Sequence, residues 1–247
     1  MELKGPNKLP VTTDNVFSLS RSMKDTVPAI RYIAVEGPIG VGKSTLADML
    51  AHHFQAKLIL ERYEENPFLQ SFYDDRRKTA FQTQLFFLLS RYRQQQELIH
   101  TDLFYESCVS DYLFAKDQIF AEVNLNRDEL KLYEEVTSAL DKTVPTPDVV
   151  IYLQGSVSLL QQNIKKRGRN FEKNMNREYL EQIVRAYNDF FFHYRDTRLV
   201  VASCDDFDFL NRPEHFQRLV STILRSPYPP VEYLSTGEPF FELMPRS

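Results

Sequence analysis

The sequence predicts an α/β protein, a doubly wound parallel sheet of about five strands with helices on both faces. The first observation behind this prediction is a set of short, nearly continuous apolar runs, of which 148–153 (DVVIYL) is the clearest. Such runs are typical of strands buried on both faces, because a half-exposed strand would alternate with polar residues. The second observation is that segments with apolar residues at helical spacing separate these runs, as crossover helices separate parallel strands.

The expected elements follow one another without an internal repeat or a linker rich in Pro, Gly or Ser. Strands are expected at 31–36, 57–61, 105–111, 148–153 and 198–202, of which the third has the weakest pattern. Helices are expected at 43–54, 78–100, about 112–123, about 127–140, about 157–166, about 176–194 and 213–224. One domain is therefore expected at 29–226. It lies between a polar, proline-punctuated tail at 1–28 and a tail at 227–247 that holds five of the 13 prolines.

Composition narrows the class of protein. The chain has 247 residues, of which 43% are hydrophobic and 26% charged, and this suits a globular domain. Its net charge of -4 argues against a dedicated nucleic-acid binder, so no nucleic-acid partner is expected. The longest apolar runs fall far short of a bilayer span, and the N-terminus lacks a signal pattern. We therefore expect a cytoplasmic protein without a membrane partner.

Cysteine usage agrees with that location. Cys108 and Cys204 stand alone, without a CxxC motif or a histidine at metal-ligand spacing. This favours two reduced, buried thiols over a disulfide or a metal site.

A phosphate-binding loop joins the first expected strand to the first expected helix. Residues 37–44, GPIGVGKS, match the P-loop pattern GxxxxGK[ST] in full. The glycines let the backbone curl so that its N–H groups point at phosphate oxygens, and the helix N-terminus adds partial positive charge. Lys43 is expected to neutralise the β- and γ-phosphates, and the Ser44 hydroxyl to ligate Mg²⁺. The predicted ATP site contains Gly37, Pro38, Ile39, Gly40, Val41, Gly42, Lys43, Ser44 and Thr45.

A P-loop alone leaves several classes of nucleotide-binding protein open. A GTPase would carry DxxG and NKxD, and a motor or AAA-type ATPase an hhhhDE strand; none of these strings occurs. A small-molecule kinase needs arginines that close over the phosphates, and 165–169 (KKRGR) supplies them just after a helix. A solvated helix end is the alternative interpretation of this cluster.

Several strings, in order, resemble the deoxynucleoside kinase family, the group that contains deoxycytidine, deoxyguanosine and deoxyadenosine kinases of the bacterial-like type. They are GPIGVGKST, a strand-ending glutamate followed by ENPFLQSFY, TQLFFLLSRYR, IFA, PDVVIYL and KKRGRNFE. The resemblance spans about 31–224 and leaves both tails unexplained. It implies a P-loop kinase fold with an arginine-bearing lid, Mg²⁺ with ATP as donor, a deoxynucleoside acceptor and a homodimer.

The resemblance implies a catalytic set of Glu61, Lys43, Arg167 and Arg169. Glu61 ends the second expected strand, at the edge where ligands of such sheets bind. In the family this glutamate accepts the proton of the sugar 5′-hydroxyl, a role that needs a carboxylate within hydrogen-bond reach. Surface charge is the default interpretation of a single glutamate without the resemblance.

For the nucleobase, the resemblance implies Gln84 and Arg91. They lie two helical turns apart, so both project from one helix face, and glutamine can both donate and accept at a base edge. Gln82 is an alternative by local string, but it lies well round the helix from Arg91. Phe120 resembles the aromatic that stacks on the base, with core packing as its alternative. Asp117 resembles the aspartate that pairs with the helix arginine, a feature that favours deoxyadenosine, deoxyguanosine or deoxycytidine over thymidine.

Two further sets follow from the resemblance. Tyr73 and Glu172 resemble the residues that hold the sugar 3′-hydroxyl. The loop 205–209 (DDFDF) resembles the loop that binds the adenine of ATP, which places Asp208 and Phe209 at that site.

The third strand departs from the family pattern, which ends there in Glu/Asp-Arg-Ser. One alignment places Asp111 at the acid near Mg²⁺, with Tyr112 in place of the arginine; the other uses Glu106-Ser107 but loses register with IFA. We prefer Asp111, which gives Ser44 and Asp111 as the predicted metal ligands. Either way an arginine is missing, so the lid arginines are expected to carry more of the phosphate charge. Asn163 also replaces a basic residue that often begins the lid pattern.

The leading hypothesis is therefore a kinase that uses ATP and Mg²⁺ to make a deoxynucleoside 5′-monophosphate for nucleotide salvage. A nucleoside-monophosphate kinase is a second possibility, although it needs further cations for the phosphate of its acceptor. A weakened nucleotide-binding regulator is a third, which the missing arginine favours.

Overall fold

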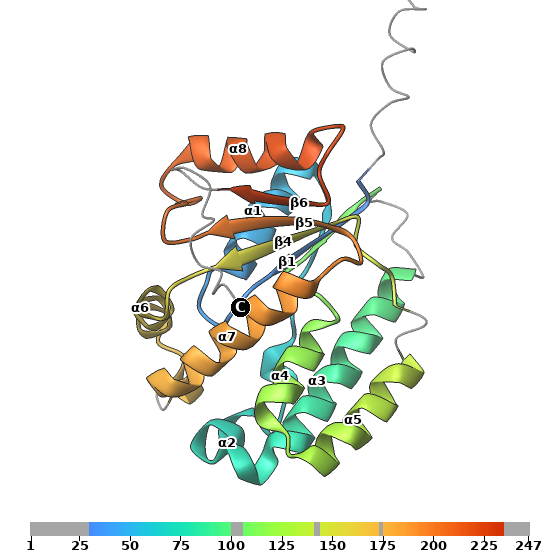
Figure 1. Ribbon diagram of the computed structural model, residues 1–247, viewed down its shortest axis with the longest axis vertical. Helices are drawn as coiled ribbons and strands as arrows, with labels where there is room; N and C mark the ends of the chain where they lie inside the picture. Colours follow the sequence, from blue (N-terminus) through green and yellow to red (C-terminus); the bar gives the residue numbers. More distant parts are fainter. Residues whose placement is uncertain (1–29, 100–105, 141–143, 173–174, 235–247) are drawn as a thin grey trace, which may run out of the picture.

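The computed structural model describes residues 30–99, 106–140, 144–172 and 175–234. The expected N-terminal tail, 1–28, and the chain after 234 lie outside these ranges. Within them, no helix is both long and apolar enough to cross a bilayer. The described strands form one parallel sheet with helices on both faces, as the sequence predicts (Figure 1).

The sheet has six strands in the part of the chain that the structure describes, one more than expected. They are β1 (Tyr32–Glu36), β2 (Lys57–Ile59), β3 (Cys108–Ser110), β4 (Val149–Gln154), β5 (Arg198–Ser203) and β6 (Val231–Leu234). Their order is β2-β3-β1-β4-β5-β6, and every neighbouring pair is parallel. β2 and β3 lie on one side of β1, and β4, β5 and β6 on the other, which is a doubly wound arrangement.

The sixth strand corrects the expected C-terminal tail. β6 lies inside 227–247, which the proline content assigns to a tail, yet all four of its residues pair with β5. The Glu232 carboxylate of this strand also lies 2.7 Å from the guanidinium of Arg225, just after the last helix. The sequence does not reveal β6 because four residues next to Pro229 and Pro230 give no usable period.

Eight α-helices lie in the described ranges. They are α1 (Lys43–Phe54), α2 (Leu69–Asp74), α3 (Arg76–Ile99), α4 (Lys116–Asn124), α5 (Arg127–Leu140), α6 (Val157–Arg167), α7 (Arg177–His193) and α8 (Pro213–Leu224). Two short 3-10 helices, η2 (Tyr63–Glu65) and η4 (Asn170–Glu172), accompany them. The short α2 is not expected from the sequence. α4 begins four residues later than expected, because the buried Glu36 carboxylate accepts the Leu113 backbone N–H at 2.7 Å and holds the preceding residues in a loop.

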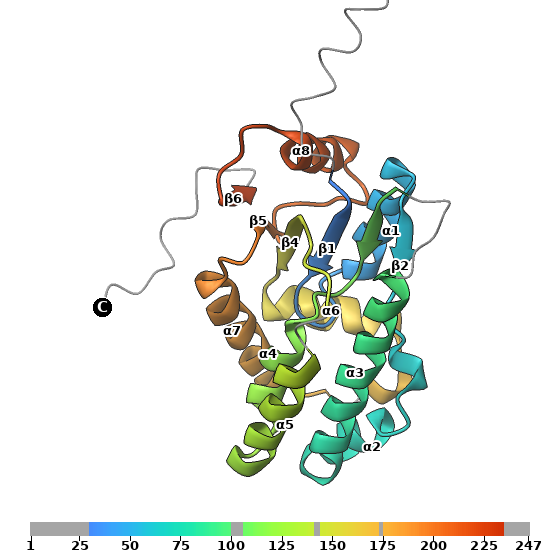
Figure 2. The ribbon, with the colours of Figure 1, turned by 90° about the vertical axis from the view of Figure 1, so that its right-hand side faces the viewer.

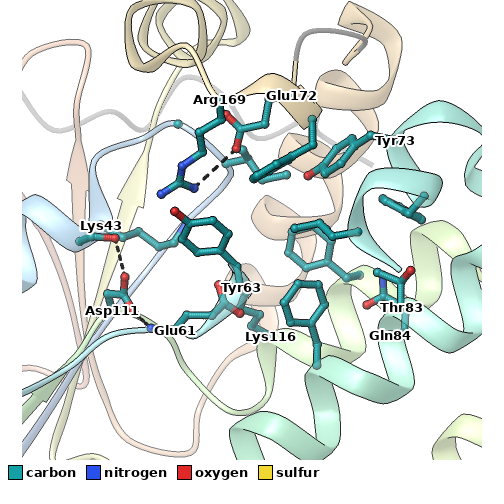
Figure 3. A pocket seen from close by; sticks show the side chains of 18 of the residues that line it. Lys43, Glu61, Tyr63, Tyr73, Thr83, Gln84, Asp111, Lys116, Arg169 and Glu172 are labelled. Atoms are coloured by element: carbon teal, nitrogen blue, oxygen red, sulfur yellow. Dashed lines mark hydrogen bonds and ion pairs between the residues drawn. The ribbon is translucent and has the colours of Figure 1, made fainter. Parts of the chain in front are cut away.

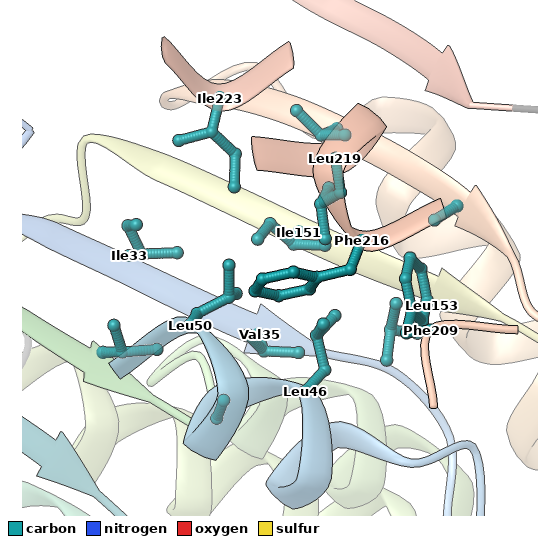
Figure 4. Packing of buried hydrophobic residues seen from close by; sticks show 14 of the residues in the cluster. Ile33, Val35, Leu46, Leu50, Ile151, Leu153, Phe209, Phe216, Leu219 and Ile223 are labelled. Carbon is teal, nitrogen blue, oxygen red and sulfur yellow. The ribbon is translucent and has the colours of Figure 1, made fainter. Parts of the chain in front are cut away.

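Alternate residues of the strands face two apolar cores, as the period of a strand dictates. The core between the sheet, α1 and α8 contains Ile33, Val35, Leu46, Leu50, Ile151, Phe216 and Leu219 (Figure 4). The core on the other face contains Tyr32, Ala34, Ile119, Val150, Tyr152, Ile183 and Tyr187. Burial on both faces explains why the central strands lack polar alternation.

The carboxyl ends of β1, β2 and β3 meet at one edge of the sheet. The chain leaves β1 into the P-loop, β2 into Leu60 and Glu61, and β3 into Asp111. β1 lies where the strand order reverses, which is where ligands bind in open parallel sheets. Figure 2 shows α3, α4, α5 and α7 grouped beside one another away from α8, and α3 contributes Gln84 and Arg91 to this edge.

Candidate active site

The P-loop is shaped by close packing against α6. A Cβ at Gly40, whose φ is +87°, would lie 2.8 Å from Ile164 Cγ1 and 3.0 Å from the Leu160 carbonyl oxygen. Only glycine fits this combination of backbone conformation and approach. Asn163 Nδ2 donates to the Gly40 carbonyl oxygen at 2.9 Å. The residue that replaces the family's basic residue therefore fixes the loop through a hydrogen bond.

Lys43 folds back on the loop. Its Nζ donates to the Gly37 and Pro38 carbonyl oxygens, at 2.7 Å and 3.2 Å. Burial, with the nearby charge of Lys116, lowers the pKa of Lys43 to about 8. The ammonium group thus lies at the mouth of the loop, where phosphate oxygens would compete for it.

One pocket at this edge collects most of the predicted site residues (Figure 3). It is lined by Ile39, Gly40, Lys43, Ser44, Glu61, Tyr73, Gln84, Arg91, Asp111, Phe120, Arg167, Arg169 and Glu172 from the predicted set. The remaining P-loop residues, Gly37, Pro38, Val41, Gly42 and Thr45, lie outside the lining, although Gly37 and Pro38 hold Lys43 through their carbonyl groups. Residues from seven separate segments of the chain thus meet in one cavity.

The P-loop side of the pocket contains the predicted metal ligands. Ser44 Oγ donates to Asp111 Oδ2 at 2.5 Å. The alternative acid, Glu106, is exposed before β3 and does not line the pocket, so the geometry favours the alignment through Asp111. No group of three or more His, Cys, Asp or Glu residues in the described ranges could hold a metal by itself. Two adjacent hard oxygen donors fit Mg²⁺ that takes further ligands from nucleotide phosphates and water.

Glu61 lies between two cations. Its Oε1 pairs with the Arg91 guanidinium, and its Oε2 accepts from Lys116 Nζ at 2.9 Å. Burial alone would raise the pKa of the Glu61 carboxyl, but the charges of Arg91 and Lys116 outweigh burial and hold this pKa well below its usual range. Glu61 is therefore ionised, as a proton acceptor must be.

Arg91 links Glu61 to the end of the pocket where the sequence predicts a nucleobase. Its other terminal nitrogen pairs with Oδ1 of Asp117, which is buried behind Arg91 rather than on the pocket wall. Burial raises the pKa of the Asp117 carboxyl to about 6, despite the charge of Arg91. Gln84 lines the pocket, whereas Gln82 is exposed on the same helix. The geometry therefore favours Gln84 for contact with a base edge.

Phe120 of α4 has neighbours both in the pocket and in the core. It lines the pocket and meets Tyr187 edge-on at 6.0 Å between ring centroids. One side of this ring thus packs in the core and the other reaches the cavity, so both interpretations of Phe120 describe part of its surroundings.

The segment after α6 covers the pocket as the predicted lid. The Glu172 carboxylate lies 2.6 Å from Arg167 and 3.7 Å from Arg169, so one buried acid restrains both lid arginines. Phe171 of the same segment stacks on Tyr73, with 5.6 Å between centroids. The lid therefore contacts the wall that α2 supplies.

The loop expected to bind adenine does not reach this pocket. Phe209 packs in the core beside α1 and α8, and the Asp208 carboxylate accepts the backbone N–H groups of Leu210 and Asn211. Neither residue lines the cavity. Their adenine contact stays a prediction.

Seven polar or aromatic residues line the pocket that were not expected from the sequence: Tyr63, Phe72, Thr83, Phe87, Lys116, Phe171 and Tyr179. The Arg169 guanidinium lies 3.8 Å from the centroid of the Tyr63 ring, a cation–π contact that positions the lid. The residues NFE, which follow the basic cluster in a string that resembles the family, could have indicated Phe171. Neither Tyr63 nor Lys116 stood out by pattern, because a tyrosine or a lysine near a helix start is commonly solvated.

Comparison with known proteins identifies the family of the chain. Residues 33–226 match the family model described as deoxynucleoside kinase. The deoxyguanosine kinase of Bacillus subtilis (strain 168) is 36% identical over 199 residues, covering 78% of this chain and 95% of that protein. The deoxyadenosine/deoxycytidine kinase of the same organism is 30% identical over 205 residues, covering 80% and 93%.

A solved structure extends the likeness to three dimensions. The deoxyadenosine kinase from M. mycoides with bound dATP superposes with a TM-score of 0.69 at 25% identity, covering 78% of this chain and 98% of that one. The sequence motifs, the parallel sheet and the family match all indicate the same family. The chain belongs to the deoxynucleoside kinase family.

Proposed function

We propose that this protein transfers the γ-phosphoryl group of ATP to the 5′-hydroxyl of a 2′-deoxynucleoside, as an enzyme of nucleotide salvage. The observation that carries the proposal is the position of Glu61. Its carboxylate lies in the same pocket as the P-loop, with Lys43, and as the α3 face, with Gln84 and Arg91 (Figure 3). A carboxylate between a phosphate site and a base site is placed to accept the proton of a sugar hydroxyl.

In the proposed reaction the 5′-oxygen forms a bond to the γ-phosphorus while the bond from that phosphorus to the bridging oxygen breaks. The electron pair of the broken bond stays on ADP, and the 5′ proton passes to Glu61. Lys43, Arg167 and Arg169 stabilise the negative charge of the transferring group. Mg²⁺, held by Ser44 and Asp111, would supply further neutralisation of phosphate charge.

The base end of the pocket supports deoxyadenosine, deoxyguanosine or deoxycytidine rather than thymidine as the acceptor. Arg91 is fixed by Asp117, and Gln84 offers both a donor and an acceptor to a base edge. The names of the relatives point the same way, since they are deoxyguanosine, deoxyadenosine and deoxyadenosine/deoxycytidine kinases. Tyr73 and Glu172 would hold the sugar 3′-hydroxyl between α2 and the lid.

A radiolabelled-ATP assay over the four deoxynucleosides tests the proposal. We expect Mg²⁺-dependent formation of a labelled 5′-monophosphate from deoxyadenosine, deoxyguanosine or deoxycytidine, at a higher kcat/KM than with thymidine. No labelled product from any of the four would refute it. Transfer only to nucleoside monophosphates would favour the monophosphate kinase instead, and tight ATP binding without transfer to any acceptor would favour the regulator.

Assembly and location are further proposals that rest on the family resemblance. We infer a homodimer in the cytoplasm. Light scattering after size exclusion would then give twice the chain mass of 29.1 kDa, and a monomer at assay concentration would contradict the homodimer.

A further inference from the structure

The side chain that follows Asp111 takes no part in the pocket. Tyr112 is fully buried, does not line the cavity, and accepts a hydrogen bond from Gln95 Nε2 at 3.2 Å on its hydroxyl. The end of β3 therefore supplies a carboxylate to the site but no cation.

The first turn of α4 instead supplies a cation to the pocket. Lys116 is buried, and its Nζ lies 2.9 Å from Glu61 Oε2 inside the pocket (Figure 3). Burying an ammonium group is costly unless a partner compensates for the lost hydration. Lys116 has that partner in Glu61, and the position of its Nζ is therefore fixed relative to the proton acceptor.

The geometry brings Lys116 close to the reacting atoms. An acceptor hydroxyl that donates to Glu61 Oε2 lies about 2.8 Å from that oxygen. The hydroxyl oxygen and the Lys116 nitrogen would then share one carboxylate oxygen, which puts them at most about 6 Å apart. Once Glu61 no longer holds Nζ, a rotation of the lysine side chain would bring it within hydrogen-bond reach of the transferring group.

Charge balance shows why this cation matters during the reaction. Glu61 and Asp117 balance the charges of Arg91 and Lys116, the two cations with which they form ion pairs. When Glu61 accepts the 5′ proton it becomes neutral, and Lys116 loses its only anionic partner among the described residues. Its full charge then faces the negative charge that spreads over the transferring phosphoryl group.

We propose that Lys116 is a catalytic residue of this protein, which holds the Glu61 carboxylate before reaction and donates a hydrogen bond to the transferring phosphoryl group as Glu61 takes the proton. The inference rests on the proposed function. In this step Lys116 acts only as a hydrogen-bond donor, and the 5′ proton leaves Glu61 for solvent after ADP and the monophosphate depart. The weakened-regulator interpretation then loses its main support, because Lys116 supplies the cation that β3 lacks.

Three variants test the role of Lys116. Lys116→Met removes the charge at similar length, Lys116→Arg keeps a cation, and Tyr112→Phe is the matched control because it alters the residue after Asp111 outside the pocket. We expect Lys116→Met to lower kcat by about 100-fold while the KM for nucleoside changes less than threefold. Lys116→Arg should retain at least a tenth of the wild-type kcat, and Tyr112→Phe should keep it within threefold.

Binding of a transition-state mimic gives a readout independent of turnover. ADP, Mg²⁺, aluminium fluoride and a deoxynucleoside together imitate the transferring phosphoryl group. Lys116→Met should weaken the assembly of this complex by at least tenfold, with the affinity for ATP alone unchanged within threefold. A merely structural lysine would change both affinities or neither.

The outcomes separate this inference from the proposed function. A wild-type protein that phosphorylates no deoxynucleoside refutes the function. An active wild type with Lys116→Met within threefold in kcat refutes only the role of Lys116. If Lys116→Met does not fold, as its thermal melt would show, Lys116→Gln replaces it, and full activity of that variant equally overturns the inference.

Discussion

Ser44 Oγ donates a 2.5 Å hydrogen bond to Asp111 Oδ2, which joins the first turn of α1 to the end of β3. The other oxygen of the same carboxylate accepts the Glu61 backbone N–H at 2.7 Å. One side chain therefore fixes the P-loop helix and Glu61, the proposed proton acceptor, relative to each other. It also sets two hard oxygen donors beside the phosphate site.

Replacing Asp111 should weaken the use of Mg²⁺ more than nucleoside binding. Asp111→Asn keeps the shape but removes the charge that attracts a divalent cation. We expect the Mg²⁺ concentration for half-maximal activity to rise at least tenfold, since metal affinity depends on anionic oxygen ligands. The matched control is Glu106→Gln, which alters the exposed acid of the competing alignment. An unchanged Mg²⁺ dependence in Asp111→Asn, or a shift in Glu106→Gln, would contradict this assignment.

Glu61→Gln should abolish turnover while the protein still binds nucleoside. The amide cannot accept the 5′ proton, so kcat is expected to fall by about 10²–10⁴-fold. Equilibrium binding of the deoxynucleoside, followed by calorimetry, should stay within about tenfold. Glu65→Gln is the control, because Glu65 follows on an exposed turn near the same strand and lies outside the pocket. A fully active Glu61→Gln variant would remove Glu61 from its proposed role.

Much of the fold could be predicted because its signals are local. The apolar runs at β1, β4 and β5 can be recognised in the sequence, and the P-loop motif fixes the position of α1 along the chain. The sequence does not predict β6 and α2, because four and six residues are too few to show a hydrophobic period. Their existence depends on pairing with β5 and packing against α3, which only the folded chain supplies.

A site residue could be predicted where it belongs to a sequence motif or to a string that resembles the family. Glu61, Gln84 and Arg91 fall in one pocket for that reason. No motif or family string marks Lys116. It contacts Glu61, which lies 55 positions earlier in the sequence, and its burial depends on where α4 begins. Phe209 also belongs to a family string, but its ring packs in the core and does not line the pocket, so its contact with adenine stays a prediction.

Gln84→Ala should weaken nucleoside binding selectively. Gln84 is buried at the pocket wall, so truncation removes a base contact and leaves the partner group on the base without a hydrogen bond. We expect the KM for the preferred deoxynucleoside to rise about tenfold or more, with the KM for ATP unchanged. Gln82→Ala, on the exposed face of the same helix, is the matched control. Equal effects of the two substitutions would count against a role of Gln84 in base recognition.

Stability should depend strongly on the core between α1 and the sheet. Leu50 is fully buried in that core, so Leu50→Ala should lower the free energy of unfolding by about 2–5 kcal/mol. Leu132 is 50% exposed on α5, and Leu132→Ala is expected to change the free energy of unfolding by less than about 1 kcal/mol. Urea unfolding followed by circular dichroism measures both values. Similar losses from the two substitutions would contradict the packing of α1 on the sheet.

The two thiols should react slowly in the native protein. Cys108 and Cys204 are both free and half-buried, so neither is as buried as the sequence suggests. Burial raises the pKa of the Cys108 thiol from 9.0 to about 11, and that of the Cys204 thiol from 9.0 to about 12. Only the thiolate attacks a disulfide reagent, and a raised pKa leaves less thiolate at a given pH.

At pH 8 an unfolded cysteine with a pKa near 9 is about one-tenth thiolate, whereas a thiol with a pKa near 11 is about one-thousandth thiolate. We therefore expect Cys108 in the folded protein to react with Ellman's reagent at least about 100-fold more slowly than in urea, and Cys204 more slowly still. Single variants, Cys108→Ser and Cys204→Ser, assign the two phases. Because each tenfold rise in hydroxide raises the thiolate fraction tenfold below the pKa, the native rates should climb steadily from pH 8 to pH 10. A native rate that levels off near pH 9 would show that burial does not hold the protons on these thiols.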